Sequence, residues 1–309
     1  MKAMVCTKYG SPDVLELKEV EKCAPKGNEV LVKVHATTVQ AGDIRVRTFR
    51  SPLSLWIPMR LVLGLTRPRK SILGVELAGE IEAIGNDVTR YKKGDKVFAL
   101  TGMNFGAHAE YTCLPEDGMM AIMPTNVTYE DAASVLYGGT SALYFLKKAN
   151  IQNGHKILIY GASGTVGTSA IQLAKYFGAE VTAVCSSTNL ELVKSLGADK
   201  VLDYTKEDFT NGSERYDIIF DAVGKISKTN YKRVLTPNGS YVTVDGQGMA
   251  KIRIADIQFL KETMEMGKLK SVIDRYYPLE QIPEANQYVE RGRKKGSVVI
   301  RVIEHAKPI

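Results

Sequence analysis

The pattern of apolar and polar positions changes along the chain and predicts two kinds of structure. In the first part, short runs alternate or stay apolar between Gly, Pro and Asn turns, which is typical of strands. The expected strands are Met1–Cys6, Val14–Glu19, Glu29–Thr38, Gly74–Ile84, Lys96–Leu100 and Ala109–Leu114. The following part alternates strands with helices, and Ser271–Ile309 returns to strand, turn and strand. We therefore expect an α/β domain plus a β domain.

The stretch Lys156–Gly178 contains the parts of a phosphate-binding corner. Ile157–Tyr160 is a short apolar run, typical of a strand buried on both faces. A glycine turn follows, and Ser169–Phe177 is then expected to be a helix that ends at Gly178. In such a corner, backbone N–H groups and the positive end of the helix dipole face a pyrophosphate.

The turn itself departs from the usual GxGxxG, because Ala162 replaces the first glycine. Gly164 lets the backbone approach a phosphate, and Gly167 lets the helix pack on the strand. A tight turn of some other α/β protein is the alternative. The dinucleotide interpretation is favoured by the alternation around the turn, with further elements at Val181–Cys185, Leu190–Leu196, Lys200–Asp203, Tyr216–Asp221, Lys228–Leu235, Ser240–Val244 and Ala255–Met266.

Composition narrows the class of protein only moderately. The chain has 309 residues, 44% of them hydrophobic and 24% charged, which favours two ordinary globular domains. A net charge of +7 without a concentrated basic module does not favour nucleic-acid binding. Cys6, Cys23, Cys113 and Cys185 are scattered and are expected to be reduced packing residues. The start lacks a signal peptide and no run could span a membrane, so we expect a cytoplasmic protein.

The stretch Ile44–Ser71 mixes basic and apolar residues and contains the only tryptophan, Trp56. Its basic members are Arg45, Arg47, Arg50, Arg60, Arg67, Arg69 and Lys70, and its apolar group is Leu53, Leu55, Trp56, Ile57, Met59, Leu61, Val62 and Leu63. It is either an apolar flap over a substrate cleft or an irregular packed loop with solvated arginines. A membrane-surface patch is a third interpretation, against which Pro52 and Pro58 argue, because they interrupt a long amphipathic helix.

Several motifs occur in a fixed order along nearly the whole chain. They are the opening MKAMVCTKYGSPDVLEL, residues 72–100, residues 138–146, the turn GASGTVG, Asp221–Gly224 and Gly296–Ile300. Together they resemble the medium-chain dehydrogenase/reductases, specifically their zinc-free quinone-oxidoreductase-like branch. The resemblance implies a GroES-like β domain formed by residues 1–124 and 272–309. A Rossmann NADPH-binding domain, with a doubly wound parallel sheet, would be inserted between them as residues 125–271.

The resemblance also bears on metal and on assembly. Zinc-dependent relatives carry a cysteine shortly before the position of Asp43 and a histidine at that of Val75, and this chain has neither. Catalytic zinc needs three converging N, S or O ligands, so we expect no metal. Relatives often dimerise through a longer segment than the one between Val244 and Ala255, which leaves a sixth strand and a homodimer as open possibilities.

The residues after the second nucleotide-domain strand bear on cofactor choice. An acid about 20 residues past the turn would bind the ribose 2′-OH of NAD, whereas this chain has Ser186, Ser187, Thr188 and Asn189. Hydroxyls and no acid favour NADPH, although relatives often place Arg or Lys there. By resemblance, the cofactor-binding residues are Thr140, Ala162, Ser163, Gly164, Thr165, Val166, Gly167, Ser186, Ser187, Asn189, Tyr204, Val223, Asp245 and Gly246.

Without metal, the acceptor must already be electrophilic, as quinones and α,β-unsaturated carbonyls are. The resemblance places Gln40, Asp43 and Arg45 at the cleft floor as the catalytic candidates. A structural carboxylate is the alternative for Asp43, and an exposed strand-end charge is the alternative for Arg45. Trp56 and Tyr137 are the candidates for lining the substrate site, with core packing as the alternative for Tyr137.

Other functions remain open at this point. A trans-2-enoyl-thioester reductase of the same superfamily would carry a proton-donating tyrosine after the Asp43 motif, but no tyrosine occurs between Gly10 and Arg90. A secondary alcohol dehydrogenase would need a base or a metal for the hydroxyl proton. A non-catalytic NADPH-binding protein would have the same nucleotide turn, and only turnover would distinguish it.

Overall fold

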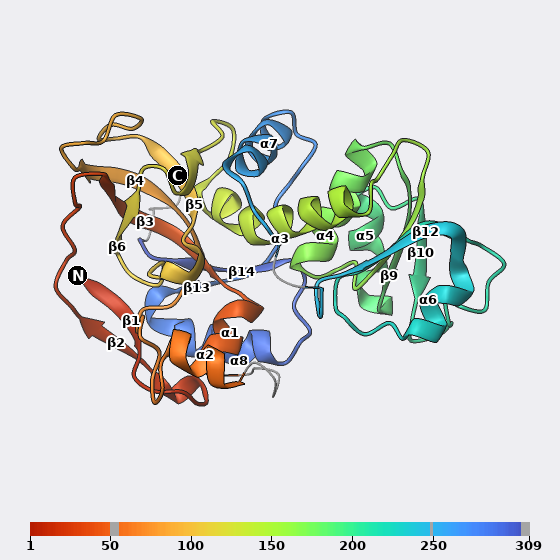
Figure 1. Cartoon of the computed structure of the whole chain (residues 1–309), viewed down its shortest axis with the longest axis horizontal. Helices are drawn as coiled ribbons and strands as arrows, with labels where there is room; N and C mark the ends of the chain where they lie inside the picture. The colour runs from red at the N-terminus through yellow and green to blue at the C-terminus, as the bar shows by residue number, and fades with distance from the viewer. Residues whose placement is uncertain (50–55, 248–249, 304–309) are drawn as a thin grey trace. The chain divides into compact units, whose positions relative to one another are not determined.

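The computed structural model describes residues 1–49, 56–247 and 250–303. The chain forms two compact units (Figure 1). Unit 1 comprises Met1–Leu136 and Ile273–Ile309, and unit 2 comprises Tyr137–Val272. The division falls inside helix α3 (Tyr129–Lys148).

Unit 1 is built mainly from antiparallel strand pairs. Its strands are β1 (Lys2–Cys6), β2 (Leu15–Glu19), β3 (Glu29–Val39), β4 (Glu76–Ile84), β5 (Lys96–Leu100), β6 (Tyr111–Pro115), β7 (Met119–Ile122), β13 (Ile273–Pro278) and β14 (Ser297–Arg301). Among these described strands, only β13 and β14 pair in parallel. The larger sheet has the order β13-β14-β3-β4-β5-β7, and β6 also pairs with β3. Because β14 from the tail pairs with β3, both ends of the chain build this domain, as the resemblance predicts.

Three helices of unit 1 were not predicted. They are α1 (Ala41–Arg47), α2 (Trp56–Leu63) and α8 (Ile282–Glu290). The prediction of only strand and turn for the tail was wrong at α8, although its buried residues Ile282, Ala285, Asn286 and Val289 follow helical spacing. These residues pack with Ile44 of α1 in one apolar cluster, apart from the polar Asn286.

Unit 2 is a doubly wound parallel sheet with the strand order β10-β9-β8-β11-β12. Its strands are β8 (Lys156–Tyr160), β9 (Glu180–Cys185), β10 (Lys200–Asp203), β11 (Tyr216–Asp221) and β12 (Leu235–Thr243), and its helices besides α3 are α4 (Thr165–Tyr176), α5 (Leu190–Ser195), α6 (Lys228–Val234) and α7 (Ile254–Glu265). Phe145 of α3 packs on Phe220, whereas Val234 of α6 packs with Ile219, which points to the opposite face. Helices on both faces define the Rossmann architecture that the alternation predicts.

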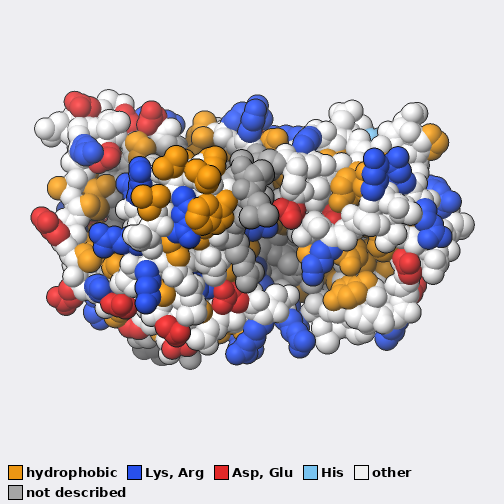
Figure 2. Space-filling model, turned by 60° about the horizontal axis from the view of Figure 1, so that its bottom comes forward, with side chains coloured by type: hydrophobic (Ala, Val, Ile, Leu, Met, Phe, Trp, Pro, Cys, Tyr) orange, Lys and Arg blue, Asp and Glu red, His pale blue; other side chains and the backbone are white. Residues whose placement is uncertain are grey.

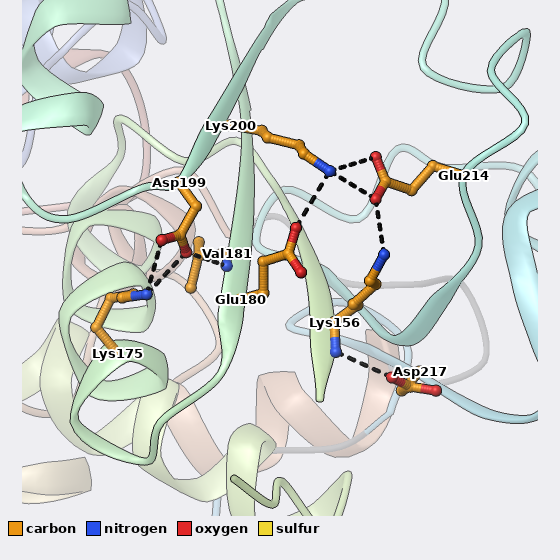
Figure 3. Close-up of polar contacts among 8 residues, drawn as sticks. All are labelled: Lys156, Lys175, Glu180, Val181, Asp199, Lys200, Glu214 and Asp217. Atoms are coloured by element: carbon orange, nitrogen blue, oxygen red, sulfur yellow. Dashed lines mark hydrogen bonds and ion pairs between the residues drawn. The ribbon is translucent and has the colours of Figure 1, made fainter. Parts of the chain in front are cut away.

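Opposite charges line the amino ends of the strands in unit 2 (Figure 3). Lys200 Nζ lies 3.1 Å from Glu180 Oε1 and 2.7 Å from Glu214 Oε1. Lys175 Nζ donates to both carboxylate oxygens of Asp199, at 2.9 and 2.8 Å. These side chains are all partly exposed, so each pair contributes little to stability.

Within the three described ranges, no helix has both the length and the apolar character needed to cross a bilayer.

Candidate functional site

The glycine turn joins β8 to α4 at the carboxyl edge of the parallel sheet. Gly161 has φ +75°, which favours glycine, and Gly164 is the N-cap of α4 with φ −79°. Helix α4 begins at Thr165, earlier than the predicted Ser169, so Thr165, Val166 and Gly167 form its first turn. Since Gly164 offers no side chain to cap them, these backbone N–H groups and the helix dipole suit a phosphate.

Two glycines hold the helices close to this turn. A Cβ on Gly167 would lie 2.3 Å from the Gly161 carbonyl oxygen, and one on Gly138 would lie 2.5 Å from the Thr165 carbonyl oxygen. A Cβ on Gly164 would meet nothing nearer than 3.5 Å. Gly167 is therefore required for packing, whereas Gly164 leaves open space at the helix N-terminus.

The end of β9 contains a carboxylate neighbour that sequence reasoning missed. Ser187 Oγ donates to Asp203 Oδ2, and Thr205 donates to Asp203 Oδ1 through its N–H at 3.0 Å and its hydroxyl at 2.7 Å. The Ser187 bond, followed by the Thr205 bond, lowers the pKa of Asp203 to about 2. Asp203 pairs with Cys185 in the parallel register, so its position at this edge could have been inferred from the two predicted strands.

Asn189 connects the same region to the glycine turn. Its Nδ2 donates to Ser163 Oγ at 3.0 Å and to Ser186 Oγ at 3.2 Å. Ser186 Oγ also lies 3.3 Å from Thr188 Oγ1. The predicted residues Ser163, Ser186 and Asn189 therefore form one hydrogen-bonded group, while Ser187 is turned to Asp203.

Exposed aromatic and apolar side chains flank this group. Tyr204 follows β10, is 54% exposed, and its ring centroid lies 6.2 Å from that of Tyr160 at the end of β8. Val223 follows β11 and is exposed. It lies against the glycine turn, because a Cβ added to Gly161 would be 2.2 Å from Cγ2 of Val223. Both side chains offer apolar surface at the carboxyl edge, which suits the flat faces of a nucleotide.

The turn after β11 is fixed by a buried carboxylate. Asp221 Oδ1 accepts from the N–H groups of Val223 at 3.0 Å and Gly224 at 2.8 Å. A Cβ on Gly224 would lie 2.5 Å from Cβ of Asp245, so the two predicted segments meet. Gly246 beside it has φ +75°, a backbone conformation that favours glycine.

Thr140 and Tyr137 lie one turn apart on α3. Thr140 is buried, and its hydroxyl lies 3.5 Å from the Tyr137 carbonyl oxygen. Tyr137 is half-buried. Both belong to unit 2, together with the predicted cofactor-binding residues.

Unit 1 contains a buried polar cluster around Glu76. Gln40 Nε2 donates to Glu76 Oε1 at 2.7 Å and to Thr38 Oγ1 at 3.1 Å, and the Thr38 hydroxyl donates to the same carboxylate oxygen. Both amide hydrogens of Gln40 are thus engaged within the protein. Sequence reasoning missed Glu76, because no spacing in the chain connects it to Thr38 and Gln40.

Asp43 connects α1 to the loop before β4. Its Oδ2 accepts from the Gln40 N–H at 2.8 Å and its Oδ1 from the Gly74 N–H at 3.0 Å. Burial raises the pKa of Asp43, and nearby His108 opposes that shift. His108 Nε2 lies 2.9 Å from the Thr38 carbonyl oxygen. These contacts are those expected if Asp43 is a structural carboxylate, which is the alternative to a catalytic role.

Lys294 is a half-buried titratable group beside the Glu76 cluster. Its Nζ donates to the Gly296 carbonyl oxygen at 2.6 Å. Burial lowers its pKa to about 8, and the negative charges of Glu76 and Asp274 oppose this shift. The ammonium group therefore lies within the field of the Glu76 cluster.

Two arginines of α1 differ sharply. Arg45 is exposed and lies on helix α1. The alternative that it is an exposed charge at the end of a strand is therefore wrong about the secondary structure. Arg47 is fully buried: it donates to Asn286 Oδ1 at 3.2 Å, to Glu290 Oε1 at 2.5 Å and to the Gly10 carbonyl oxygen. Arg47 therefore connects α1 to α8 and is not one of the solvated arginines that the sequence suggested.

Helix α2 exposes a cluster of apolar side chains in the basic-apolar stretch. Trp56 is 44% and Ile57 67% exposed, and the other exposed members of this cluster are Leu61, Val62 and Leu65. Figure 2, in which the lower side of Figure 1 comes forward, shows apolar side chains gathered beside Lys and Arg side chains. Arg60 Cζ lies 3.8 Å from the Phe49 ring centroid and 5.0 Å from that of Trp56. Arg50, Leu53 and Leu55 of this stretch lie outside the described residues.

The zinc-ligand positions of related dehydrogenases carry other residues in this chain. Shortly before Asp43 the chain has no cysteine, and the position of the histidine is taken by Val75, whose side chain has no ligating atom. Across the residues that the structure describes, no three His, Cys, Asp or Glu side chains gather as a metal site would require. The donor set does not fit catalytic zinc.

A GroES-like unit joined to a Rossmann unit, with a glycine turn at the carboxyl edge of the sheet, defines a two-domain dehydrogenase. An alcohol dehydrogenase GroES-like domain model matches residues 26–124, and a zinc-binding dehydrogenase model matches residues 165–277. The 2-methylene-furan-3-one reductase of Solanum lycopersicum is 35% identical over 98% of this chain and 79% of its own. The chain belongs to the medium-chain dehydrogenase/reductase family and is an oxidoreductase of its quinone-oxidoreductase type.

Further relatives agree with this assignment. The chloroplastic NADPH-dependent alkenal/one oxidoreductase of Arabidopsis thaliana is 32% identical, over 97% of this chain and 79% of its own. The structure of the quinone oxidoreductase from Coxiella burnetii has a TM-score of 0.89 at 28% identity and covers 98% of this chain and 99% of its own.

Proposed function

We propose that this protein transfers hydride from NADPH to a quinone or an α,β-unsaturated carbonyl without zinc. The observation that carries the proposal is the glycine turn, at which Gly164 leaves open space at the uncapped start of α4. The cofactor supplies the hydride when it is bound. The names of two relatives, a 2-methylene-furan-3-one reductase and an alkenal/one oxidoreductase, support a conjugated carbonyl acceptor.

The cofactor-binding residues would act from the ends of neighbouring strands. Backbone N–H groups of Thr165, Val166 and Gly167 would bind the pyrophosphate, and Tyr204 would pack beside the adenosine. Ser186 and Asn189 would hold the ribose and its 2′-phosphate. Ser187 is held by Asp203, so Ser186 is the hydroxyl that we expect to distinguish NADPH from NADH.

Val223, Asp245, Gly246 and Thr140 would complete the site at the nicotinamide end. The segment of Asp245 and Gly246 lies against the turn of Val223 and Gly224, so backbone groups of both are available to a carboxamide. Relatives named as NADPH-dependent and NAD(P)H oxidoreductases support a nicotinamide cofactor.

In unit 1, we assign the charge-stabilising role to Arg45 and a positioning role to Gln40 and Asp43. Negative charge develops on the carbonyl oxygen as hydride arrives, and the Arg45 guanidinium would stabilise it. Gln40 and Asp43 fix the start of α1, because the Asp43 carboxylate accepts from the Gln40 and Gly74 N–H groups. Arg45 is thereby held two residues beyond Asp43 on the same helix.

The substrate would be hydrophobic. An exposed apolar cluster of this kind is typical of a binding surface, and Trp56 is its largest member. We propose that Trp56 and its neighbours on α2 contact the apolar part of the acceptor. Tyr137 on α3 is the second residue that we propose to contact the acceptor.

The test is loss of the reduced-nicotinamide absorbance with quinones, an enone and an enoyl thioester, with and without a chelator, repeated with NADH. We expect chelator-insensitive turnover of quinone or enone with NADPH preferred. Arg45→Ala should lower kcat/KM about 100-fold, while Arg67→Ala, an exposed arginine after α2, should change it little. Turnover that a chelator abolishes would contradict the zinc-free mechanism, and NADPH binding without turnover of any acceptor would identify a non-catalytic protein.

A further inference from the structure

Two cysteines that are far apart in the sequence meet on the surface of unit 1. Cys23 Sγ and Cys113 Sγ lie 2.8 Å apart, and Cys113 donates to Cys23. Both side chains are half-buried. A disulfide has an S–S bond of about 2.0 Å, so the sulfur atoms need to approach by less than about 1 Å to bond. We propose that Cys23 and Cys113 form a reversible disulfide when the protein meets a peroxide.

The surrounding structure holds the two cysteines in place. Cys113 lies on β6 opposite Leu31 of β3, and Leu114 next to it packs into the core, so Cys113 points away from that core. Lys22, the neighbour of Cys23, places its Nζ 3.6 Å from the Tyr111 ring centroid, two residues before Cys113 on the same strand face. Lys22 also forms an ion pair with Glu82. The segment around Cys23 is thus fixed along the outer face of β6 by contacts other than the sulfurs.

The chemistry assigns distinct roles to the two thiols. The hydrogen bond from Cys113 lowers the pKa of Cys23 to about 7, whereas the same bond raises the pKa of Cys113. The Cys23 thiolate attacks one peroxide oxygen, the O–O bond breaks, and the departing hydroxide takes up the proton released from Cys23 to become water. Sulfur of Cys113 then displaces the resulting sulfenic hydroxyl, which leaves with the Cys113 proton as a second water. Two thiols are oxidised by two electrons, and one peroxide is reduced to two waters.

The remaining cysteines provide an internal control. Cys6 and Cys185 are buried, and burial raises the pKa of each to about 11. Neither has the thiolate character that peroxide requires, so both should stay reduced under the same treatment.

The experiment is thiol titration under denaturing conditions after brief treatment of the full chain with hydrogen peroxide. We expect the wild-type protein to lose two of its four thiols, to lose about 2 Da, and to recover both thiols with dithiothreitol. Cys23→Ser and Cys113→Ser should each form no intramolecular bond, whereas Cys185→Ser should lose two thiols like the wild type. Lys22→Ala, which leaves both sulfurs, should slow bond formation several-fold.

Two results would overturn the proposal. One is a chain that keeps all four thiols, or whose Cys23 is converted to sulfinic acid with Cys113 still reduced. The other is a bond that joins two chains, seen as a dimer on a non-reducing gel.

Discussion

The two ends of the parallel sheet in unit 2 have opposite chemical character. At the amino ends, Lys200 and its acidic partners form exposed ion pairs that leave little charge unmatched (Figure 3). At the carboxyl ends, the chain has glycine, hydroxyl and exposed apolar groups around the start of α4, and the Asp203 carboxylate there accepts hydrogen bonds from the hydroxyls of Ser187 and Thr205. Both edges belong to the same five strands, so the fold alone does not create the difference. The side chains at the carboxyl ends make that edge the candidate cofactor site.

The largest effects should come from the glycines of the turn. In Gly167→Ala, the new Cβ would meet the Gly161 carbonyl oxygen at 2.3 Å, so the start of α4 must move. We expect a loss of about 1–3 kcal/mol in the free energy of unfolding and no measurable NADPH binding. Urea unfolding and fluorescence titration with NADPH would measure both.

Gly164→Ala is the matched variant that separates cofactor binding from stability. The nearest atom to its new Cβ would be the Gly161 carbonyl oxygen at 3.5 Å, and the φ angle of Gly164, −79°, suits alanine. The fold should therefore be unaffected. The methyl group would occupy the space assigned to the pyrophosphate, and we expect the Kd for NADPH to rise at least tenfold. Unchanged NADPH affinity in this variant would argue against the assigned phosphate site.

A charge at Ser186 should change the choice of cofactor. Ser186→Asp would place a carboxylate beside the 2′-phosphate, and we expect the ratio of kcat/KM for NADPH over NADH to fall about tenfold or more through like-charge repulsion. Ser213→Asp adds the same charge in an exposed loop before β11 and serves as the control. An unchanged ratio in Ser186→Asp would exclude Ser186 from recognition of the 2′-phosphate.

Asp203 should make the carboxyl edge sensitive to acid. Its pKa is lowered from 3.8 to about 2, so its contribution to stability is complete above about pH 5 and is lost as the pH falls through 3.8 toward about 2. The Tm difference between the wild type and Asp203→Asn should therefore shrink between about pH 5 and pH 2. A Tm difference that stays constant over this range would show that the Asp203 carboxylate does not stabilise the fold.

The smallest effects are expected at the amino edge. Lys200→Gln removes two ion pairs between partly exposed groups, and such pairs are screened by water. We expect a Tm shift of less than about 2 °C, decreasing further at high salt, and an unchanged Kd for NADPH. A large loss of NADPH affinity in Lys200→Gln would remove the functional contrast between the two edges.

The sequence was sufficient for the fold of unit 2 because its signals are local. Strands such as Lys200–Asp203 and Tyr216–Asp221 appear in the structure with the predicted bounds. The tail helix α8 was missed even though Ile282, Ala285 and Val289 have helical spacing, which shows that the pattern was available there as well.

The polar networks were beyond prediction because they depend on pairs far apart in the chain. Gln40 meets Glu76, Arg47 meets Glu290, and Cys23 meets Cys113 only after strands and helices from distant segments have packed. The four cysteines are scattered in the sequence, but in the structure Cys23 and Cys113 are adjacent, whereas Cys6 and Cys185 are each buried.

Amide hydrogen exchange with and without NADPH tests the central claim most directly, because it reports on both edges of the sheet in one experiment. We predict that NADPH slows exchange in peptides covering Gly161–Thr168 and Ser186–Asn189, and leaves peptides at Asp199–Lys200 and Glu214–Asp217 unchanged. Protection confined to the amino edge, or bound NADPH that leaves the glycine turn unprotected, would contradict the account.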